Sequence, residues 1–193
     1  MTTGGWEVRL LALDPGINCS GWALFEDGQL VRAGVCFGRP EDAARPSIER
    51  VVMMGDRLCE EVVPHYPPPD RLVLERPQIY RPDRAKGNPN DLLVLAELGA
   101  YVTGRLTHRR AVKQYLPREW KGNVDPEVCV ARVQERLTLG ERALVEFPPS
   151  ACDGCRAFGP CVKPSCPMHN AFDAIGLGLF DLGRFGKRRV IVR

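Results

Sequence analysis

Three acidic residues stand where apolar segments end or where other polar side chains are missing. Asp14 closes the apolar run LLALD directly before Pro-Gly, and Glu75 closes the run RLVLE. Asp173 is the only polar side chain between Ala171 and Phe180. A buried carboxylate is unfavourable unless a nearby charge neutralises it. Each of these three residues therefore needs a partner elsewhere in the fold.

The three carboxylates indicate a metal-dependent site if the fold brings them together. Neighbouring strands that carry Asp14 and Glu75, with the final helix packed across them, would add Asp173 and also His169, four residues earlier. Carboxylates so close repel one another and are stable together around cations. We expect Mg²⁺ or Mn²⁺, as a pair of ions that activates water on a phosphodiester. Alternatively, Asp173 forms a buried ion pair with an arginine and is structural.

A second group of potential ligands lies in one short segment. Four of the eight cysteines fall within residues 148–168, which are rich in proline and glycine, namely Cys152, Cys155, Cys161 and Cys166. Four thiolates complete a tetrahedral zinc site, which is structural because no position remains for substrate. An iron–sulfur cluster uses the same ligands and stays open, as do free thiols. His169 could replace one cysteine, although four thiolates suffice.

Apolar periodicity predicts the elements that must position these residues. The first 37 residues contain three predicted strands, and Asp27-Gly28 between the last two is a strong hairpin signal. The predicted strands are 6–14, 20–26, 29–37, 71–75 and the segment AVKQYLP, and the predicted helices are 46–63, 90–106, 126–138 and 169–184. Strands first, then strands alternating with helices, imply an α/β fold with a mixed sheet covered by helices.

Composition is ordinary for a globular protein. The 193 residues are 44% hydrophobic and 26% charged, which suits one domain over 1–193 with a substantial core. No apolar run approaches the length of a membrane helix, and the first residues lack a secretory signal. We therefore expect a cytoplasmic protein without a membrane partner.

Two basic clusters suggest a polyanionic partner. The segment ERPQIYRPDRAKGNPN is mainly basic after Glu75, and the tail GRFGKRRVIVR has five basic residues and no acid. Such clusters fit nucleic acid. A solvated loop and a solubilising tail are the alternatives.

The chain resembles the RuvC-type Holliday junction resolvases. The segments LALDPGINCSGWAL, LVLERP, YLPREWKG and HNAFDAIGLGL follow the family's motifs in order, and the resemblance covers nearly the whole chain apart from the cysteine-rich segment. It implies a ribonuclease H-like fold with a mixed five-stranded sheet flanked by helices. It also implies a homodimer that cuts four-way DNA junctions with divalent metal during recombination or repair.

Two other functions stay open. One is a RuvC-like nuclease for other branched DNA, such as forks and flaps. The other is a non-catalytic, zinc-containing DNA-binding protein, which the three retained acids argue against because clustered acids do not help to bind a polyanion.

The resemblance assigns roles to further residues. Asp14, Glu75 and Asp173 match the family's acids, whereas its remaining acid falls on Asn170. We favour the adjacent His169 as the fourth ligand, because imidazole is the better ligand.

The resemblance also implies roles for a basic and an aromatic residue. Lys121 matches a lysine expected near the scissile phosphate, as a catalytic and DNA-binding residue. Tyr80 follows Glu75 by five residues and could stack on an unpaired base, or else pack on the neighbouring helix. The basic residues expected to contact phosphates beside it are Arg81, Arg84 and Lys86.

Overall fold

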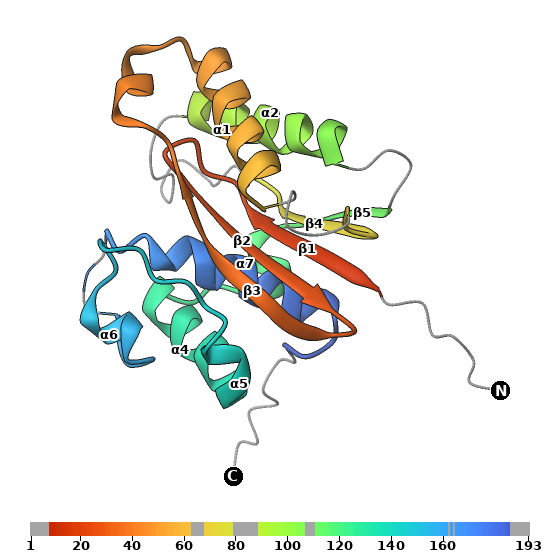
Figure 1. Cartoon of the computed structure of the whole chain (residues 1–193), viewed down its shortest axis with the longest axis vertical. Helices are drawn as coiled ribbons and strands as arrows, with labels where there is room; N and C mark the ends of the chain where they lie inside the picture. Colours follow the sequence, from red (N-terminus) through yellow and green to blue (C-terminus); the bar gives the residue numbers. More distant parts are fainter. Residues whose placement is uncertain are drawn as a thin grey trace, which may run out of the picture.

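A five-stranded sheet in the order β3-β2-β1-β4-β5 forms the middle layer of the molecule (Figure 1). The computed structural model describes residues 8–62, 68–78, 89–106, 111–161, 163 and 165–185. The strands are β1 (Arg9–Asp14), β2 (Cys19–Glu26), β3 (Gln29–Phe37), β4 (Arg71–Glu75) and β5 (Ala111–Tyr115). Neighbours among β1, β2 and β3 are antiparallel, and β4 lies parallel to both β1 and β5. The predicted mixed five-stranded sheet is confirmed.

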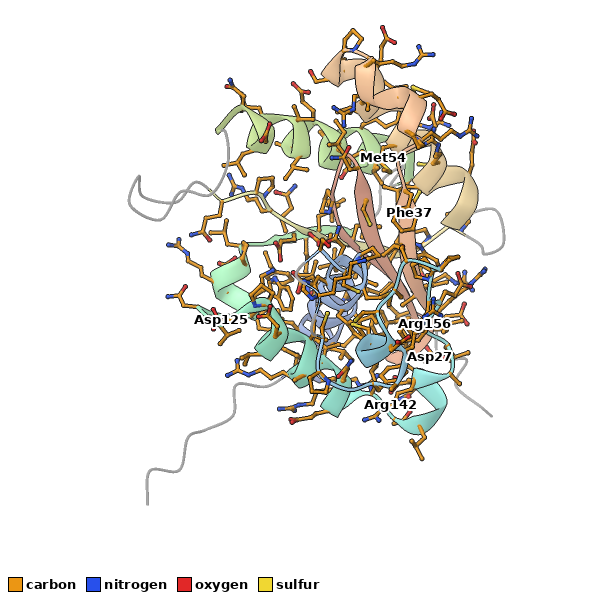
Figure 2. All side chains as sticks on the ribbon, turned by 90° about the vertical axis from the view of Figure 1, so that its left-hand side faces the viewer. Asp27, Phe37, Met54, Asp125, Arg142 and Arg156 are labelled. Carbon is orange, nitrogen blue, oxygen red and sulfur yellow. The ribbon has the colours of Figure 1, made fainter. Side chains whose placement is uncertain are left out.

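Helices cover both faces of the sheet. On one face lie α1 (Ser47–Val62) and α2 (Pro89–Leu106), and on the other lie α4 (Pro126–Arg136) and α7 (Met168–Asp181) (Figure 1). Figure 2 labels Met54 of α1, which is only 1% exposed and packs into the core between α1, α2 and the sheet. Four short helices complete the described elements, namely η1 (Pro40–Ala44), α3 (Pro117–Trp120), α5 (Leu139–Arg142) and α6 (Asp153–Arg156). None of the helices among the described residues is long and apolar enough to cross a bilayer.

The hairpin between β2 and β3 forms where the sequence predicts it. Asp27 and Gly28 have φ values of 47° and 80°, the left-handed conformations that a tight two-residue hairpin turn requires. The observed bounds of β3 and β4 equal the predicted ones. Helix α7 begins one residue earlier than predicted and ends at Asp181 rather than 184.

Helix α7 is the buried centre of the second helix layer. It packs against four strands and carries buried residues around nearly its whole circumference, as its apolar sequence predicts. Gly21 of β2 allows the closest approach, since a Cβ there would lie 1.9 Å from the backbone oxygen of Asn170. Such contact is possible only with glycine.

The end of α7 is attached to the sheet by a buried carboxylate. Asp181 accepts hydrogen bonds from Arg71 at 2.7 Å, from Lys113 at 2.7 Å and from the Tyr115 hydroxyl at 2.8 Å. Its side chain is fully buried, and these partners keep the pKa of Asp181 below its usual value although burial alone would raise it. The helix is thereby held in a defined position over β4 and β5.

Candidate active site

Asp14 and Glu75 end neighbouring parallel strands. Leu13 of β1 pairs with Leu74 of β4, and each acid is the next residue. Leu13 and Leu74 pack toward α1 and α2, so the alternation of strand side chains turns both acids toward the α7 face. The side chain of Glu75 is 15% exposed. Asp14 is likewise half-buried, so both carboxylates lie partly buried between the sheet and α7.

Lys121 joins two of the predicted acids. Its Nζ lies 2.5 Å from Oδ2 of Asp173 and 3.1 Å from Oε2 of Glu75. Lys121 directly follows α3, Glu75 ends β4, and Asp173 lies in the second turn of α7. The fold thus gathers four predicted residues, Asp14 included, from elements far apart in the chain. The arginine partner considered for Asp173 is replaced by this lysine.

The electrostatics of this group leave negative charge uncompensated. Burial raises the pKa of Asp14 well above its usual value, and the charges of Glu75 and Asp173 raise it further. Burial likewise raises the pKa of Glu75, against the opposing effect of Lys121. Burial would lower the pKa of Lys121, but the surrounding carboxylates raise it above the usual value. Three carboxylates with one ammonium have a net charge of about −2 when ionised, which a divalent cation would neutralise.

The donor atoms suit a hard divalent cation. Carboxylate oxygens are the ligands that Mg²⁺ and Mn²⁺ prefer. The three acids do not form a closed cage, because among the described residues only the cysteine cluster has three or more potential ligand atoms all within 4.8 Å of one another. An open arrangement of oxygens fits catalytic ions, which must keep coordination positions free for water and substrate.

Two residues that were not predicted as part of the site support it. The indole Nε1 of Trp120 donates to Oε2 of Glu75 at 2.9 Å, and the Trp120 ring lies over Gly176 of α7, where a Cβ would come within 2.5 Å of Cζ3. The sequence signal for this contact was present, since two glycines in an otherwise strong apolar helix indicate close packing. Lys121, the next residue, is placed by the same contact.

His169 lies away from its expected place. Its Nε2 is 3.0 Å from Sγ of Cys161, so the ring contacts the cysteine cluster. Side chains of a helix tilt toward its N-terminus, and the cysteine-rich segment immediately precedes α7. The neighbouring Asn170, which stands at the position of the family's fourth acid, donates from Nδ2 to the backbone oxygen of Cys19 at 2.5 Å. It fastens α7 to the start of β2, beside the loop that follows Asp14.

The four clustered cysteines have the geometry of a metal site. Cys152 and Cys161 have their sulfur atoms 3.6 Å apart, and those of Cys155 and Cys166 are 3.9 Å apart. Four sulfur atoms at about 2.3 Å from one ion in a tetrahedron are about 3.8 Å from one another. Cys152 is half-buried and the other three are buried. The cluster could therefore hold a metal ion, and the donor set fits zinc.

The predicted DNA-contacting residues are divided between described and undescribed parts of the chain. Tyr80, Arg81, Arg84 and Lys86 lie outside the described residues. Arg184, from the basic tail, forms an ion pair at 2.7 Å with Glu141, which is 3% exposed, and donates to the backbone oxygen of Gly28. That arginine is occupied in attaching the end of α7 to the β2–β3 hairpin, so it is structural and not part of a free basic tail.

Comparison with known proteins supports the predicted resemblance, although no family model matches the chain. The crossover junction endodeoxyribonuclease RuvC of Nitrosomonas eutropha is 27% identical over 169 residues, which cover 82% of this chain and 89% of that protein. The structure of Thermus thermophilus RuvC in complex with Holliday junction substrate has a TM-score of 0.52 at 18% identity, covering 89% of this chain and 91% of that one. A second Thermus thermophilus RuvC structure also has a TM-score of 0.52, at 15% identity, covering 92% and 98%. The chain thus has the ribonuclease H-like fold of RuvC and is similar to RuvC in sequence over most of its length.

Proposed function

We propose that this chain is a crossover junction endodeoxyribonuclease, which hydrolyses phosphodiester bonds of four-way DNA junctions with divalent metal in recombination or repair. The main structural support for this proposal is the group formed by Asp14, Glu75, Asp173 and Lys121 at the ends of two parallel strands. It occurs in a chain similar to a RuvC endonuclease over 82% of its length. A solved RuvC of the same fold is bound to Holliday junction substrate.

The residues of this site have separate roles in the proposed reaction. The three carboxylates hold Mg²⁺ or Mn²⁺, as a pair of ions that would activate water and stabilise the leaving oxygen. The Lys121 ammonium, which contacts Asp173 and Glu75, reaches the scissile phosphate when the substrate enters. Trp120 fixes the orientation of Glu75 through its indole hydrogen bond. Because His169 contacts Cys161, we propose no metal-binding role for it in the acid site.

We further propose that the four cysteines hold one structural zinc ion, with an iron–sulfur cluster as the alternative that metal analysis separates. The sulfur separations of 3.6 and 3.9 Å support a tetrahedral site. His169 is placed to donate a hydrogen bond to the Cys161 thiolate, a common way of orienting a metal ligand. The ion would then stabilise the segment that leads directly into α7.

Partners and location complete the proposal. Branched DNA is the substrate, with Tyr80, Arg81, Arg84 and Lys86 as proposed contacts. Two copies would cut a junction symmetrically; α2, where Leu93 is 63% exposed, is the proposed dimer contact. The eight cysteines are unpaired thiols, which fits a reducing compartment, and we propose the cytoplasm.

The decisive experiment compares cleavage of four-way, three-way, flap and linear duplex substrates of matched sequence. We expect paired nicks in the four-way junction with Mg²⁺ or Mn²⁺, and none with EDTA. A preference for forks or flaps would favour the alternative RuvC-like nuclease. No cleavage of any branched substrate with either ion, by protein that binds the junction, would support the non-catalytic DNA-binding alternative instead.

A further inference from the structure

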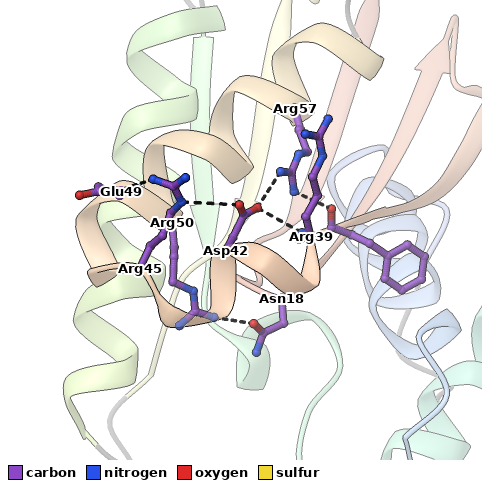
Figure 3. A network of polar contacts seen from close by, with 8 residues as sticks. Asn18, Arg39, Asp42, Arg45, Glu49, Arg50 and Arg57 are labelled. Atoms are coloured by element: carbon purple, nitrogen blue, oxygen red, sulfur yellow. Dashed lines mark hydrogen bonds and ion pairs between the residues drawn. The ribbon is translucent and has the colours of Figure 1, made fainter.

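A pocket of about 130 Å³ lies between the loop after Asp14, helix η1 and helix α1. We call it the arginine pocket, after the polar residues that line it, which are Asn18, Arg39, Asp42, Arg50 and Arg57. Figure 3 shows these residues together with their contacts. None of them was singled out by the sequence motifs, and none belongs to the acid site.

One arginine of the pocket is neutralised by a buried acid. Asp42 is only 5% exposed, and its Oδ2 accepts from Nη2 of Arg57 at 2.7 Å and from the backbone nitrogen of Arg39 at 3.2 Å. The other nitrogen of the Arg57 fork, Nη1, donates to the backbone oxygen of Phe37 at 3.1 Å. Asp42 and Arg57 both line the pocket, and their ion pair connects η1 to α1 (Figure 3).

The charges of the other two arginines of the pocket, Arg39 and Arg50, are not balanced by a carboxylate in the described part of the chain. Arg50 donates from Nη2 to Oδ1 of Asn18 at 2.6 Å, a neutral partner that orients the guanidinium without cancelling it. The Arg39 guanidinium forms no ion pair with any residue in the described part of the chain. With Arg57 balanced by Asp42, the pocket has a net charge of about +2. Two guanidinium groups around a small pocket are suited to the oxygens of a phosphate.

The pocket is tied to the active-site loop. Ile17 and Asn18 line it. The backbone nitrogen of Gly38 donates to the backbone oxygen of Asn18 at 2.9 Å, which joins the segment between β3 and η1 to this loop. Asn18 lies four positions after Asp14 in the chain, so their Cα atoms can lie at most about 14 Å apart. A strand with a phosphate at the acid site therefore has other phosphates within reach of the pocket.

We propose that the arginine pocket binds a backbone phosphate of the DNA strand that enters the acid site. The inference rests on the proposed function and adds to it a contact on the α1 side of the active site. The contact recognises phosphate and carries no base information. Its role is to place the strand, with Arg39 and Arg50 as the phosphate ligands.

Binding measurements isolate this contact from cleavage. In an Asp14→Asn background, affinity for a four-way junction is measured from about 50 to 200 mM salt, with Arg39→Gln and Arg50→Gln tested singly and together. We expect the double variant to reduce the slope of log affinity against log salt by about 1, the effect of losing one phosphate contact, with affinity about tenfold lower at the lowest salt. Arg57 is left intact because its loss would remove the hydrogen-bonded ion-pair partner of the buried Asp42.

The matched control is Arg45→Gln. It removes the same charge from the same segment, but Arg45 does not line the pocket, and its charge is already paired with Glu49 at 3.2 Å and with Asp42 at 4.0 Å. We expect its salt slope to equal that of the parent. Equal slopes for Arg39→Gln, Arg50→Gln, their combination and the parent would overturn the proposal, as would an equal loss in Arg45→Gln.

The outcomes separate this inference from the proposed function. A parent protein that cuts junctions, with pocket variants that bind normally, overturns the pocket alone. A parent that binds DNA through the pocket but cuts nothing overturns the nuclease function and leaves the phosphate contact. Inorganic phosphate is the further probe, at constant ionic strength. If it binds the parent but not the double variant, while DNA binding of the two is equal, the pocket takes free phosphate and the proposed DNA contact is wrong.

Discussion

The acid site and the cysteine cluster are assembled in opposite ways, although they share helix α7. The acid site takes Asp14, Glu75 and Asp173 from β1, β4 and α7, and Lys121 from the turn after α3, so its residues are spread over most of the chain. The cysteine cluster takes all its thiols from residues 152–166. The acid site forms only when the sheet and α7 have packed together, whereas the cysteine cluster needs only one short segment to fold. Distant carboxylates can be held close together only by a fold that resists their repulsion.

The two regions meet at the start of α7. Cys166 lies two residues before the helix begins, His169 contacts Cys161 from the first turn, and Asp173 lies in the next turn. A metal ion in the cluster would therefore stabilise the end of α7 that carries the acid site. The locally built region supports the one built by the whole fold. The following predictions test this relation, from the largest expected effect to the smallest.

Removing one carboxylate should abolish chemistry and leave the cysteine cluster intact. For Asp14→Asn we expect junction cleavage to fall about 10³-fold or more, because several kcal/mol of transition-state stabilisation depend on the bound ions. The measurement is single-turnover cleavage with Mg²⁺, alongside the metal content of the purified protein. Asp27→Asn, at the hairpin between β2 and β3, is the control and should cleave normally. Full activity of Asp14→Asn would contradict the assignment of the site.

Removing one thiol of the cysteine cluster should mainly reduce metal content and stability, whereas removing a carboxylate mainly reduces cleavage. For Cys155→Ser we expect loss of the one bound zinc per chain and of at least about 3 kcal/mol of stability, which lowers Tm by roughly 6–12 °C. Elemental analysis and thermal unfolding measure the two effects. Cys59→Ser, a half-buried thiol outside the cluster, should keep its metal. A parent protein without zinc or iron would contradict the metal site itself.

Glu141 differs from the carboxylates of the acid site, because its charge is balanced by Arg184 and its pKa is lowered. Burial would raise the pKa of Glu141, but hydrogen bonds from Arg184 and from the backbone nitrogens of Leu30 and Thr138 lower it to about 2. A pKa lowered from the ordinary 4.5 stabilises the folded state above pH 4.5, and this contribution disappears as the pH falls toward 2. At about 1.4 kcal/mol per pKa unit, the contribution is about 3 kcal/mol.

Urea unfolding at pH 6 and at pH 3 measures this effect. We expect Glu141→Gln to lose less stability than the parent between the two pH values, because glutamine does not titrate. Identical losses in the two proteins would show that the pair does not supply this part of the acid sensitivity.

The smallest effect should come from the helix contact that places Lys121. For Gly176→Ala, the new Cβ lies 2.5 Å from the Trp120 ring, so we expect a loss of about 1–3 kcal/mol from overpacking and slower cleavage. Gly99→Ala in α2 is the matched control, because a Cβ there meets nothing within 4 Å. It should gain up to about 1 kcal/mol and cleave normally. Equal cleavage by the two variants would exclude a positioning role for Trp120.

Much of the fold and of the candidate site could be predicted because the signals are local. Alternating or continuous apolar residues predicted the five strands, and strand ends at Asp14 and Glu75 marked the carboxylates. The spacing of the four cysteines predicted a closed cluster without reference to any other part of the chain. The ordered motifs predicted the family resemblance, because motif order survives even where overall identity is 27%.

The direction in which a side chain leaves its helix was decided only by the tertiary structure. His169 and Asn170 are adjacent in sequence, yet one contacts Cys161 and the other the backbone of Cys19. Trp120 reaches Glu75 only because Gly176 admits its ring, and Arg184 is withdrawn from the basic tail by Glu141. The arginine pocket gathers Asn18 from a loop, Arg39 from the residue before η1, and Arg50 and Arg57 from α1. Sequence patterns report periodicity and local spacing, whereas contacts between distant segments depend on how the layers pack, and that is a property of the whole chain.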